Sequence, residues 1–220
     1  MILWIKKYYF QLQIKVLLFL KPAIFFDRLN QLAWYKNTLQ RWVDDQHFTT
    51  QHKVLEVGCS TGILTAYIAQ SCGTVNGVDY SSKMIDLAKI NHRDIDFSVA
   101  DVLDIPFENK AFDYVIAASL LNIVSDKNKA ISELARVCKK GGTVSVLVPS
   151  TDFNDVDLGS LQASLNHSGF SAAAMDAWHN LAPKMATDDI FQLFKQAGLT
   201  EISSQDYLQG MVIAVSAVKS

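Results

Sequence analysis

The feature that most constrains the fold is a turn with two glycines that directly follows an apolar, β-branched segment. Residues 53–57 have the composition of a buried strand, and Gly58 and Gly62 follow them. Glycine has no Cβ, so the backbone can turn sharply there and lie close to a ligand. A second apolar segment, 75–78, ends at Asp79. The pattern predicts parallel strands with a ligand-binding turn at their carboxyl edge.

The position of Asp79 indicates which class of ligand the glycine turn binds. It lies 21 residues after Gly58 (79 − 58), close to the roughly 20 expected for an acid that binds a ribose diol. An adenosine-bearing cofactor is therefore expected. The nicotinamide pattern G-x-G-x-x-G is absent, because Ser60 and Ile63 stand at its second and third glycines. No Gly-Lys-Ser/Thr follows the turn either, which excludes a P-loop.

The turn resembles motif I of the class I S-adenosylmethionine-dependent methyltransferases, written E/D-x-G-x-G-x-G. Glu56, Gly58 and Gly62 match this motif. Ser60 replaces the middle glycine, and its Cβ would narrow the space beside the methionine part of the cofactor. A buried Glu56 is costly without a partner, so we expect it to bind a ligand or to order the loops.

The resemblance continues in order along the chain. A strand over 96–100 precedes Asp101-Val102, which resembles the adenine-recognition segment of the family. A strand over 112–118 leads into 119–126, which resembles the stretch with cofactor and substrate contacts. The helix 126–140 and the strand 141–149 complete the similarity. It is closest to small-molecule methyltransferases of the ubiquinone/menaquinone-biosynthesis type, over about 53–149, and weaker over the last thirty residues.

The resemblance implies S-adenosyl-L-methionine as cofactor. The expected cofactor-binding residues are Glu56, Gly58, Cys59, Ser60, Gly62, Asp79, Tyr80, Met84, Asp101, Val102, Ala118 and Ser119. The expected substrate contacts are Trp34, Tyr35, Asn122, Trp178 and His179. Asn122 stands where many relatives of this type carry a histidine, so the acceptor is not carried over from them. No catalytic residue is identified. His167 and His179 are the candidates for a general base.

We expect a Rossmann-like α/β three-layer sandwich with a mainly parallel seven-stranded sheet, an antiparallel last strand and N-terminal helices. An N-terminal helical cap over residues 1–50 would precede the Rossmann-like domain, 51–220. One amphipathic helix is expected over 27–45. The segment 151–186 is longer than a connection requires, and we expect it to be an inserted substrate cover with helices over 157–167 and 172–179.

Residues 1–26 are rich in aromatic and aliphatic side chains, but Lys6, Lys7, Lys15 and Lys21 interrupt them. This composition fits neither a membrane-spanning helix nor a signal peptide. Two alternatives stay open: a helix that covers the active site, or a contact with a membrane surface or a second copy of the chain. The expected location is the cytoplasm, with or without peripheral membrane contact.

The composition limits the partners. The chain has 220 residues and a formal charge of −2, so no basic field favours nucleic acid. Three cysteines form neither a metal pattern nor a disulfide framework, and no metal site is expected. We expect an enzyme that transfers a methyl group to a small-molecule acceptor by in-line displacement. The alternative is a non-catalytic protein that binds S-adenosylmethionine, or an interaction protein, on the same scaffold.

Overall fold

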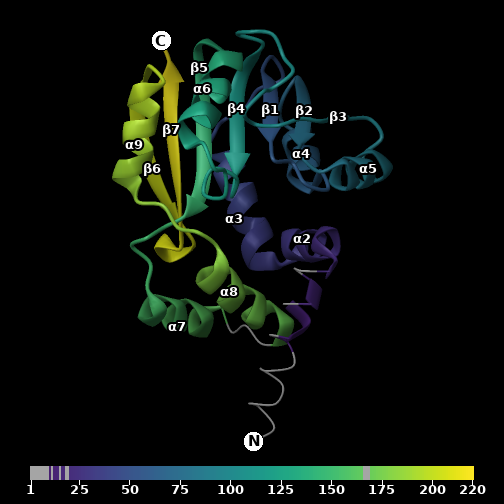
Figure 1. The fold of residues 1–220 in the computed structure, drawn as a ribbon, viewed down its shortest axis with the longest axis vertical. Coiled ribbons are helices and arrows are strands. Elements are labelled where there is room, and N and C mark those ends of the chain that lie inside the picture. The colour runs from purple at the N-terminus through teal and green to yellow at the C-terminus, as the bar shows by residue number, and fades with distance from the viewer. Residues whose placement is uncertain (1–9, 11, 15, 18–19, 166–168) are drawn as a thin grey trace, which may run out of the picture.

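Seven strands form one sheet in the order β3-β2-β1-β4-β5-β7-β6 (Figure 1). The computed structural model describes residues 10, 12–14, 16–17, 20–165 and 169–220. The strands are β1 (Lys53–Val57), β2 (Thr74–Asp79), β3 (Asp96–Val99), β4 (Phe112–Ala118), β5 (Cys138–Pro149), β6 (Leu199–Tyr207) and β7 (Val212–Lys219). The pairs from β3 through β5 are parallel, and β7 is antiparallel to both β5 and β6. The predicted fold class is confirmed.

Helices cover both faces of the sheet. They are α2 (Pro22–Gln31), α3 (Ala33–Asp44), α4 (Ile63–Ile68), α5 (Ser82–Asn91), α6 (Lys127–Val137), α7 (Asp155–Ser164), α8 (Gly169–Leu181) and α9 (Thr187–Gln196), with a short 3-10 turn at Leu208–Gly210. Residues of α6 and α9 pack on one face, and those of α3 and α4 pack on the other. Helix α5 packs beside β3 at the sheet edge. The result is the expected three layers.

Alternation along β1 explains the two core regions. Leu55 and Val57 pack with the α6–α9 core, whereas Val54 packs with α3 and α4. Successive side chains of a strand point to opposite faces, so Glu56 shares the face of Val54. Trp42 of α3 donates its indole N–H to Ser145 Oγ of β5 at 3.0 Å, which anchors α3 on that face.

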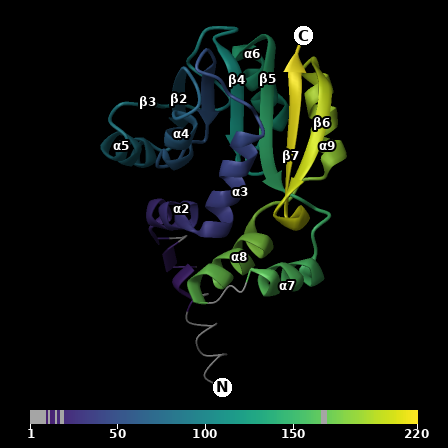
Figure 2. The same ribbon diagram turned by 180° about the vertical axis from the view of Figure 1, so that it is seen from behind.

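Three helices lie at the carboxyl end of the parallel strands. Figures 1 and 2 show α2, α7 and α8 beyond the arrowheads of β4 and β5, whereas α3 extends from this end onto the face of the sheet. The expected single helix over 27–45 is wrong, because Leu32 has an extended conformation (φ −67°, ψ 127°) and separates α2 from α3. This break lets α3 turn its buried face, including Trp42 and Val43, onto the sheet. The two helices expected within 151–186 are present as α7 and α8.

Side-chain caps start helices α5, α6 and α7. Ser81 accepts from the Met84 N–H and starts α5 as the sequence indicates. Asp126 accepts from the Lys129 N–H and starts α6. Half of the segment 1–26, and His167, lie outside the described residues. Within the described part of the chain, no helix has the length and apolar character needed to cross a bilayer.

Candidate functional site

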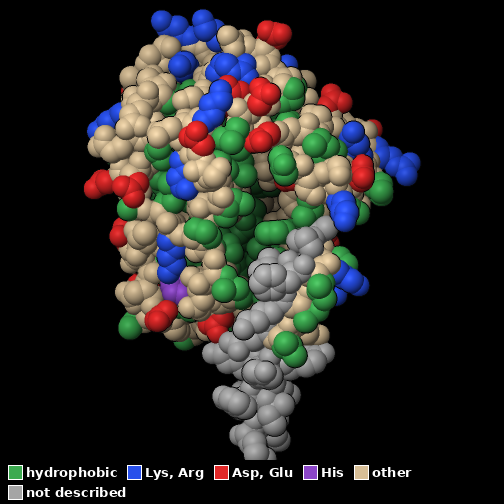
Figure 3. Space-filling model, viewed as in Figure 1, with side chains coloured by type: hydrophobic (Ala, Val, Ile, Leu, Met, Phe, Trp, Pro, Cys, Tyr) green, Lys and Arg blue, Asp and Glu red, His purple; other side chains and the backbone are tan. Residues whose placement is uncertain are grey.

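A cavity of about 630 Å³ lies at the carboxyl edge of the sheet. The space-filling view shows it as a hollow surrounded by hydrophobic side chains (Figure 3). Its lining comes from the turns that follow β1, β2, β3 and β4 and from helices α2 and α3. A cavity at this place is the usual ligand site of an open α/β sheet.

The glycine turn after β1 forms one wall. The N–H groups of Gly58 and Cys59 both donate to the Val78 carbonyl, at 2.7 and 2.9 Å, which joins this turn to β2. Gly58 has φ +82°, and a Cβ there would lie 3.3 Å from Leu120. Ser60 has φ +51°, in the left-handed region that glycine favours. The residue therefore departs from the glycine motif, but its backbone keeps the conformation that the motif requires.

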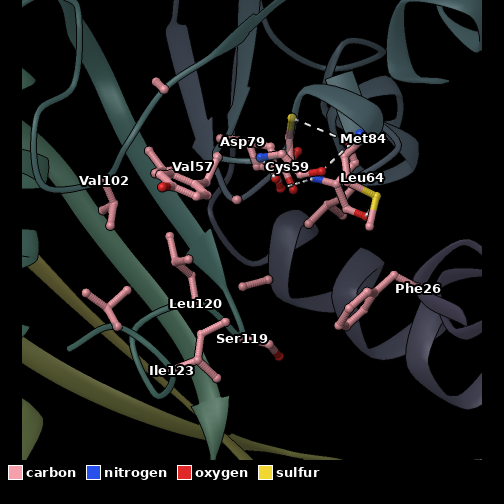
Figure 4. Close-up of a pocket in the computed structure, with 18 of the residues that line it drawn as sticks. Phe26, Val57, Cys59, Leu64, Asp79, Met84, Val102, Ser119, Leu120 and Ile123 are labelled. Atoms are coloured by element: carbon pink, nitrogen blue, oxygen red, sulfur yellow. Dashed lines mark hydrogen bonds between the residues drawn. The ribbon is translucent and has the colours of Figure 1, made fainter. Parts of the chain in front are cut away.

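Asp79 holds this turn from the end of β2. Its Oδ2 accepts from the Ser60 N–H and its Oδ1 from the Ser81 N–H, both at 2.9 Å. Each carboxylate oxygen has two lone pairs, so each retains one for a ligand hydroxyl. The side chain is thus oriented before any ligand binds (Figure 4).

Glu56 is a buried acid at the floor of the cavity. Its Oε2 accepts from the Thr65 hydroxyl of α4 at 2.5 Å. Burial raises the pKa of Glu56 to about 7, and the nearby Asp79 adds to the increase. Tyr35 of α3 lies close by, and its hydroxyl is 3.2 Å from Ser119 Oγ. Burial, together with the charge of Glu56, raises the pKa of Tyr35 above its usual value.

The turn after β3 supplies Asp101 and Val102. Asp101 Oδ1 accepts from the Leu103 N–H at 2.9 Å, which fixes the carboxyl group at the cavity wall. Two residues of α6 hold the following loop. Arg136 donates to the carbonyls of Ile105 and Phe107, at 2.7 and 2.8 Å. Glu133 accepts from the Ile105 N–H at 3.0 Å, and the Arg136 side chain keeps the pKa of Glu133 low, at about 2.

Eleven of the twelve residues expected to bind cofactor line this one cavity. Gly62 is outside the lining. It precedes the first residue of α4 with φ +81° and lies against Phe97, where a Cβ would clash at 2.6 Å. Its role in the structure is therefore to let the chain enter α4. Cys59 is buried, and burial raises the pKa of its thiol, so the group stays protonated.

Of the five residues expected to contact substrate, Tyr35 alone is in the lining. Trp34 and Trp178 pack behind it, with ring centroids 5.8 Å apart. Asn122 is buried and donates to the Pro183 carbonyl at 3.1 Å. His179 is buried in a separate cluster with Asp155 and Lys184. The role of these four residues in substrate binding stays a prediction.

Sequence reasoning missed several lining residues. They are Phe26, Asn30 and Leu39 from α2 and α3, and Leu103, Leu120, Ile123, Val124 and Ser125 from the turns after β3 and β4, with Val57, Leu64, Ser81 and Ala100 nearer the glycine turn. The sequence shows the apolar periodicity of the N-terminal helices, but this periodicity does not indicate which side chains face a cavity.

The chemistry of the lining fits an adenosine-bearing cofactor. Asp79 and Asp101 present carboxyl oxygens, which accept from hydroxyl and amino groups. The same lining contains apolar side chains such as Met84 and Leu103, on which an adenine base could pack. Within the described residues, no three His, Cys, Asp or Glu side chains gather where they could hold a metal ion.

Solved structures share this fold. The Bacillus YcgJ protein superposes with a TM-score of 0.63 at 15% identity, over 84% of this chain and 98% of that one. A Thermotoga maritima protein titled an S-adenosylmethionine-dependent methyltransferase, possible histamine N-methyltransferase, gives 0.66 at 17% identity, over 89% and 94%. The [4+2]-cyclase SpnF gives 0.63 at 18% identity, over 85% and 84%. At these identities the likeness shows the fold alone.

Sequence comparison adds curated relatives and a domain match. A demethylmenaquinone methyltransferase from Staphylococcus aureus is 32% identical over 134 residues, which is 57% of this chain and 56% of that protein. The enzyme of the same name from Staphylococcus haemolyticus is 30% identical over the same shares of the two chains. The chain thus spans about half the length of these curated relatives. Residues 55–146 match a family model described as a methyltransferase domain. That segment runs from within β1 to within β5, and it contains all of the cavity lining except Phe26, Asn30, Tyr35 and Leu39, so the matched part of the chain is the part that builds most of the cavity.

Proposed function

We propose that this chain is an enzyme that transfers a methyl group from S-adenosylmethionine to a small molecule. The observation that carries the proposal is the meeting of Glu56, the Gly58–Ser60 turn, Asp79 and Asp101 around one cavity. These residues come from three different strand ends, and the sequence resemblance assigns all of them to one cofactor. The match of residues 55–146 to a methyltransferase-domain model supports the same interpretation.

Each wall of the cavity has a role in this proposal. Asp79 accepts from the two ribose hydroxyls with the lone pairs that the Ser60 and Ser81 amides leave free. Asp101 accepts from the adenine amino group and the Val102 N–H donates to the ring. Tyr80 and Met84 pack beside the adenine. Glu56 and Ala118 lie toward the methionine part of the cofactor, and Ser119 lies where this part meets the space for the acceptor.

Asp79, Asp101 and the Gly58–Ser60 turn would hold the cofactor, which would supply an electrophilic methyl carbon on a positively charged sulfur. An acceptor atom could then bond to this carbon while the electron pair of the carbon–sulfur bond stays on sulfur. The protein has to hold the acceptor in line and to exclude water. Helices α2 and α3 contribute to the exclusion of water by closing the cavity with Phe26, Tyr35 and Leu39. In this proposal they form a lid.

The acceptor itself is not carried over from the relatives. The demethylmenaquinone methyltransferases match only over about half of their length, and the residues of α2 and α3 lie outside the family match of 55–146. Contact of residues 1–26 with a membrane or with a second copy also stays a prediction.

Calorimetry with S-adenosylhomocysteine tests the binding half of the proposal. We expect saturable binding and a rise in melting temperature with ligand concentration, because the ligand binds the folded state alone. Transfer of tritiated methyl from S-adenosylmethionine into a small-molecule filtrate of cell extract tests the catalytic half. An absence of binding at millimolar ligand would refute the proposal.

The second candidate is a protein of this scaffold that binds the cofactor without transferring its methyl group. The [4+2]-cyclase SpnF shares this fold, and its name refers to a reaction other than methyl transfer. The fold alone therefore does not decide between the two candidates. Turnover separates the two. Binding of S-adenosylmethionine with no methyl transfer to any fraction of the filtrate would favour the second candidate.

A further inference from the structure

The part of the cavity that faces away from Asp79 combines residues outside the family match with residues inside it. Phe26 and Tyr35 come from α2 and α3, and they face Leu120 and Ile123 in the turn after β4. Figure 4 shows Phe26 and Ile123 on opposite sides of the open space, with Ser119 between them. We refer to Phe26, Tyr35, Ser119, Leu120 and Ile123 as the acceptor compartment. The inference below rests on the proposed function and concerns what this compartment admits.

The charges around the cavity have one sign. Glu56, Asp79 and Asp101 are acidic, and none of the described residues in the lining is Lys, Arg or His. An anion that entered would lose its hydration, and no side chain of the lining would supply a cationic partner. It would also be repelled by the acids across a medium less polar than water. The positive sulfur of S-adenosylmethionine is absent from S-adenosylhomocysteine, so with the latter bound the lining alone decides, and it selects against negatively charged molecules.

Apolar side chains form the entrance to the compartment. Phe26 is 37% exposed and Ile123 is 61% exposed, although both are large hydrophobic residues. Both line the cavity as well, so the exposed apolar surface continues from solvent into the interior. Such a surface gains free energy when an apolar group covers it.

One pair of neutral hydroxyls provides a polar anchor inside. The Tyr35 hydroxyl lies 3.2 Å from Ser119 Oγ, and Tyr35 is buried. Burial raises the pKa of Tyr35, so the phenol keeps its proton at neutral pH. Two paired hydroxyls retain free lone pairs and can accept a further hydrogen bond from a bound molecule.

We propose that the acceptor is an uncharged, mainly apolar molecule that places a polar group against the Tyr35–Ser119 pair and extends its apolar body between Phe26 and Ile123. The compartment offers a bond to a neutral hydroxyl and contact with hydrophobic rings and aliphatic chains. It offers no group that pairs with a carboxylate, sulfate or phosphate.

Two probes with the same ring system and different charge test whether the compartment selects against anions. 2-Naphthol is neutral at pH 7, whereas 2-naphthoate carries a carboxylate on the same ring system. Each is measured by equilibrium dialysis against the full chain saturated with S-adenosylhomocysteine. We expect 2-naphthol to bind at least about tenfold more tightly, because the anion must be desolvated beside the acids. Equal or tighter binding of 2-naphthoate, or no binding of either probe, would overturn the inference.

A positive charge introduced at the entrance provides a second test. Ile123→Lys places an ammonium group at the exposed rim, and we expect the preference for 2-naphthol to fall by about fivefold or more. Val156→Lys is the matched control, since Val156 is 78% exposed on α7 and outside the cavity lining. It should leave both affinities unchanged. An identical change of the preference in the two variants would show a general charge effect. It would contradict the inference that the acceptor compartment selects the probe by charge.

The anchor is tested by Tyr35→Phe, which removes the hydroxyl and keeps the ring. We expect 2-naphthol affinity to fall about three- to tenfold, as for one neutral hydrogen bond, with S-adenosylhomocysteine affinity unchanged. Equal losses for both ligands would place Tyr35 in the cofactor site and refute the anchor. If S-adenosylhomocysteine fails to bind the parent protein, the proposed function fails first. If it binds but the probes show the opposite preference, this inference alone fails.

Discussion

At the scale of single residues, Glu56 makes the stability of the folded chain depend on pH. The carboxyl group is buried beside Thr65, and its pKa is raised to about 7. A buried acid of this kind is costly once it ionises, because no cation accompanies it among the residues that line the cavity. Such costs are common where a site is prepared for a ligand.

The first prediction follows from that pKa. Below pH 4.5 Glu56 is protonated in both the folded and the unfolded chain. Between pH 4.5 and 7 the unfolded chain ionises while the folded chain keeps the proton, so the free energy of unfolding decreases as pH rises. Above pH 7 the penalty is constant. The total loss is at most about 3 kcal/mol.

Urea unfolding of the ligand-free protein from pH 4.5 to 8 measures this effect. Glu56→Gln keeps an oxygen for Thr65 and removes the titration, so its stability should change much less over the range. Parallel pH profiles of Glu56→Gln and the parent would show that another group is responsible.

The second prediction concerns Asp79, which has a structural and a binding role. Both of its oxygens accept backbone N–H groups, from Ser60 and Ser81. Asp79→Ala should therefore cost about 2 kcal/mol of stability and also weaken S-adenosylhomocysteine binding about tenfold or more, for bonds to a charged group. Asp79→Asn keeps one acceptor oxygen and should fall between Asp79→Ala and the parent in both measurements.

Asp86→Ala provides the control for this pair, because Asp86 is an exposed acid on the neighbouring helix α5. Thermal unfolding and calorimetry on the same samples separate the two effects. Unchanged ligand affinity in Asp79→Ala would remove the ribose role, even if stability decreases.

At the scale of elements, the loop after β3 depends on α6. Arg136 and Glu133 together bind the backbone of Ile105 and Phe107 from a distant part of the sequence. The two side chains also bond each other at 2.7 Å. This pair holds the loop that follows Asp101 and Val102, so it supports one wall of the cavity.

The third prediction is that Arg136→Met lowers stability by about 3 kcal/mol, since it leaves Glu133 as a buried charge without its main partner. S-Adenosylhomocysteine affinity should fall a few fold as the loop loosens. Arg93→Met removes an exposed arginine and is the charge-matched control. Adding Glu133→Gln to Arg136→Met should recover part of the stability. A double variant with fully additive losses would contradict the pairing.

Sequence patterns predicted the elements far better than the contacts between them. The glycine turn, the strand ends at Asp79 and Asp101 and the antiparallel final hairpin follow from local composition, because each depends on neighbouring residues. The break at Leu32 does not, because tertiary packing of α3 on the sheet decides it. The bond between Tyr35 and Ser119 joins residues 84 positions apart, and no periodicity reports such a meeting.

At the scale of the whole molecule, two polar bonds join the N-terminal helices to the cofactor edge. Tyr35 of α3 bonds Ser119 after β4, and Thr61 of the glycine turn donates to Asp27 of α2 at 3.3 Å. Trp178 of α8 packs on Trp34 and Tyr35, so the inserted helices support α3 from outside the cavity. A ligand in the cavity would contact α2 and α3 directly and α8 through these rings.

The last prediction uses that order of contacts. Hydrogen exchange with and without S-adenosylhomocysteine should show slower exchange in α2, α3 and the Gly58–Ser60 turn, because bound ligand stabilises the states in which these segments are closed. Helix α8 should show a smaller decrease, since it lies outside the lining and contacts the lining residue Tyr35 through Trp178. Strand β6 is an exposed edge far along the sheet order from β1, and it should exchange at the same rate in both samples. If the glycine turn becomes protected while α2 and α3 do not change, these helices are fixed walls of the cavity and their role as a lid is refuted.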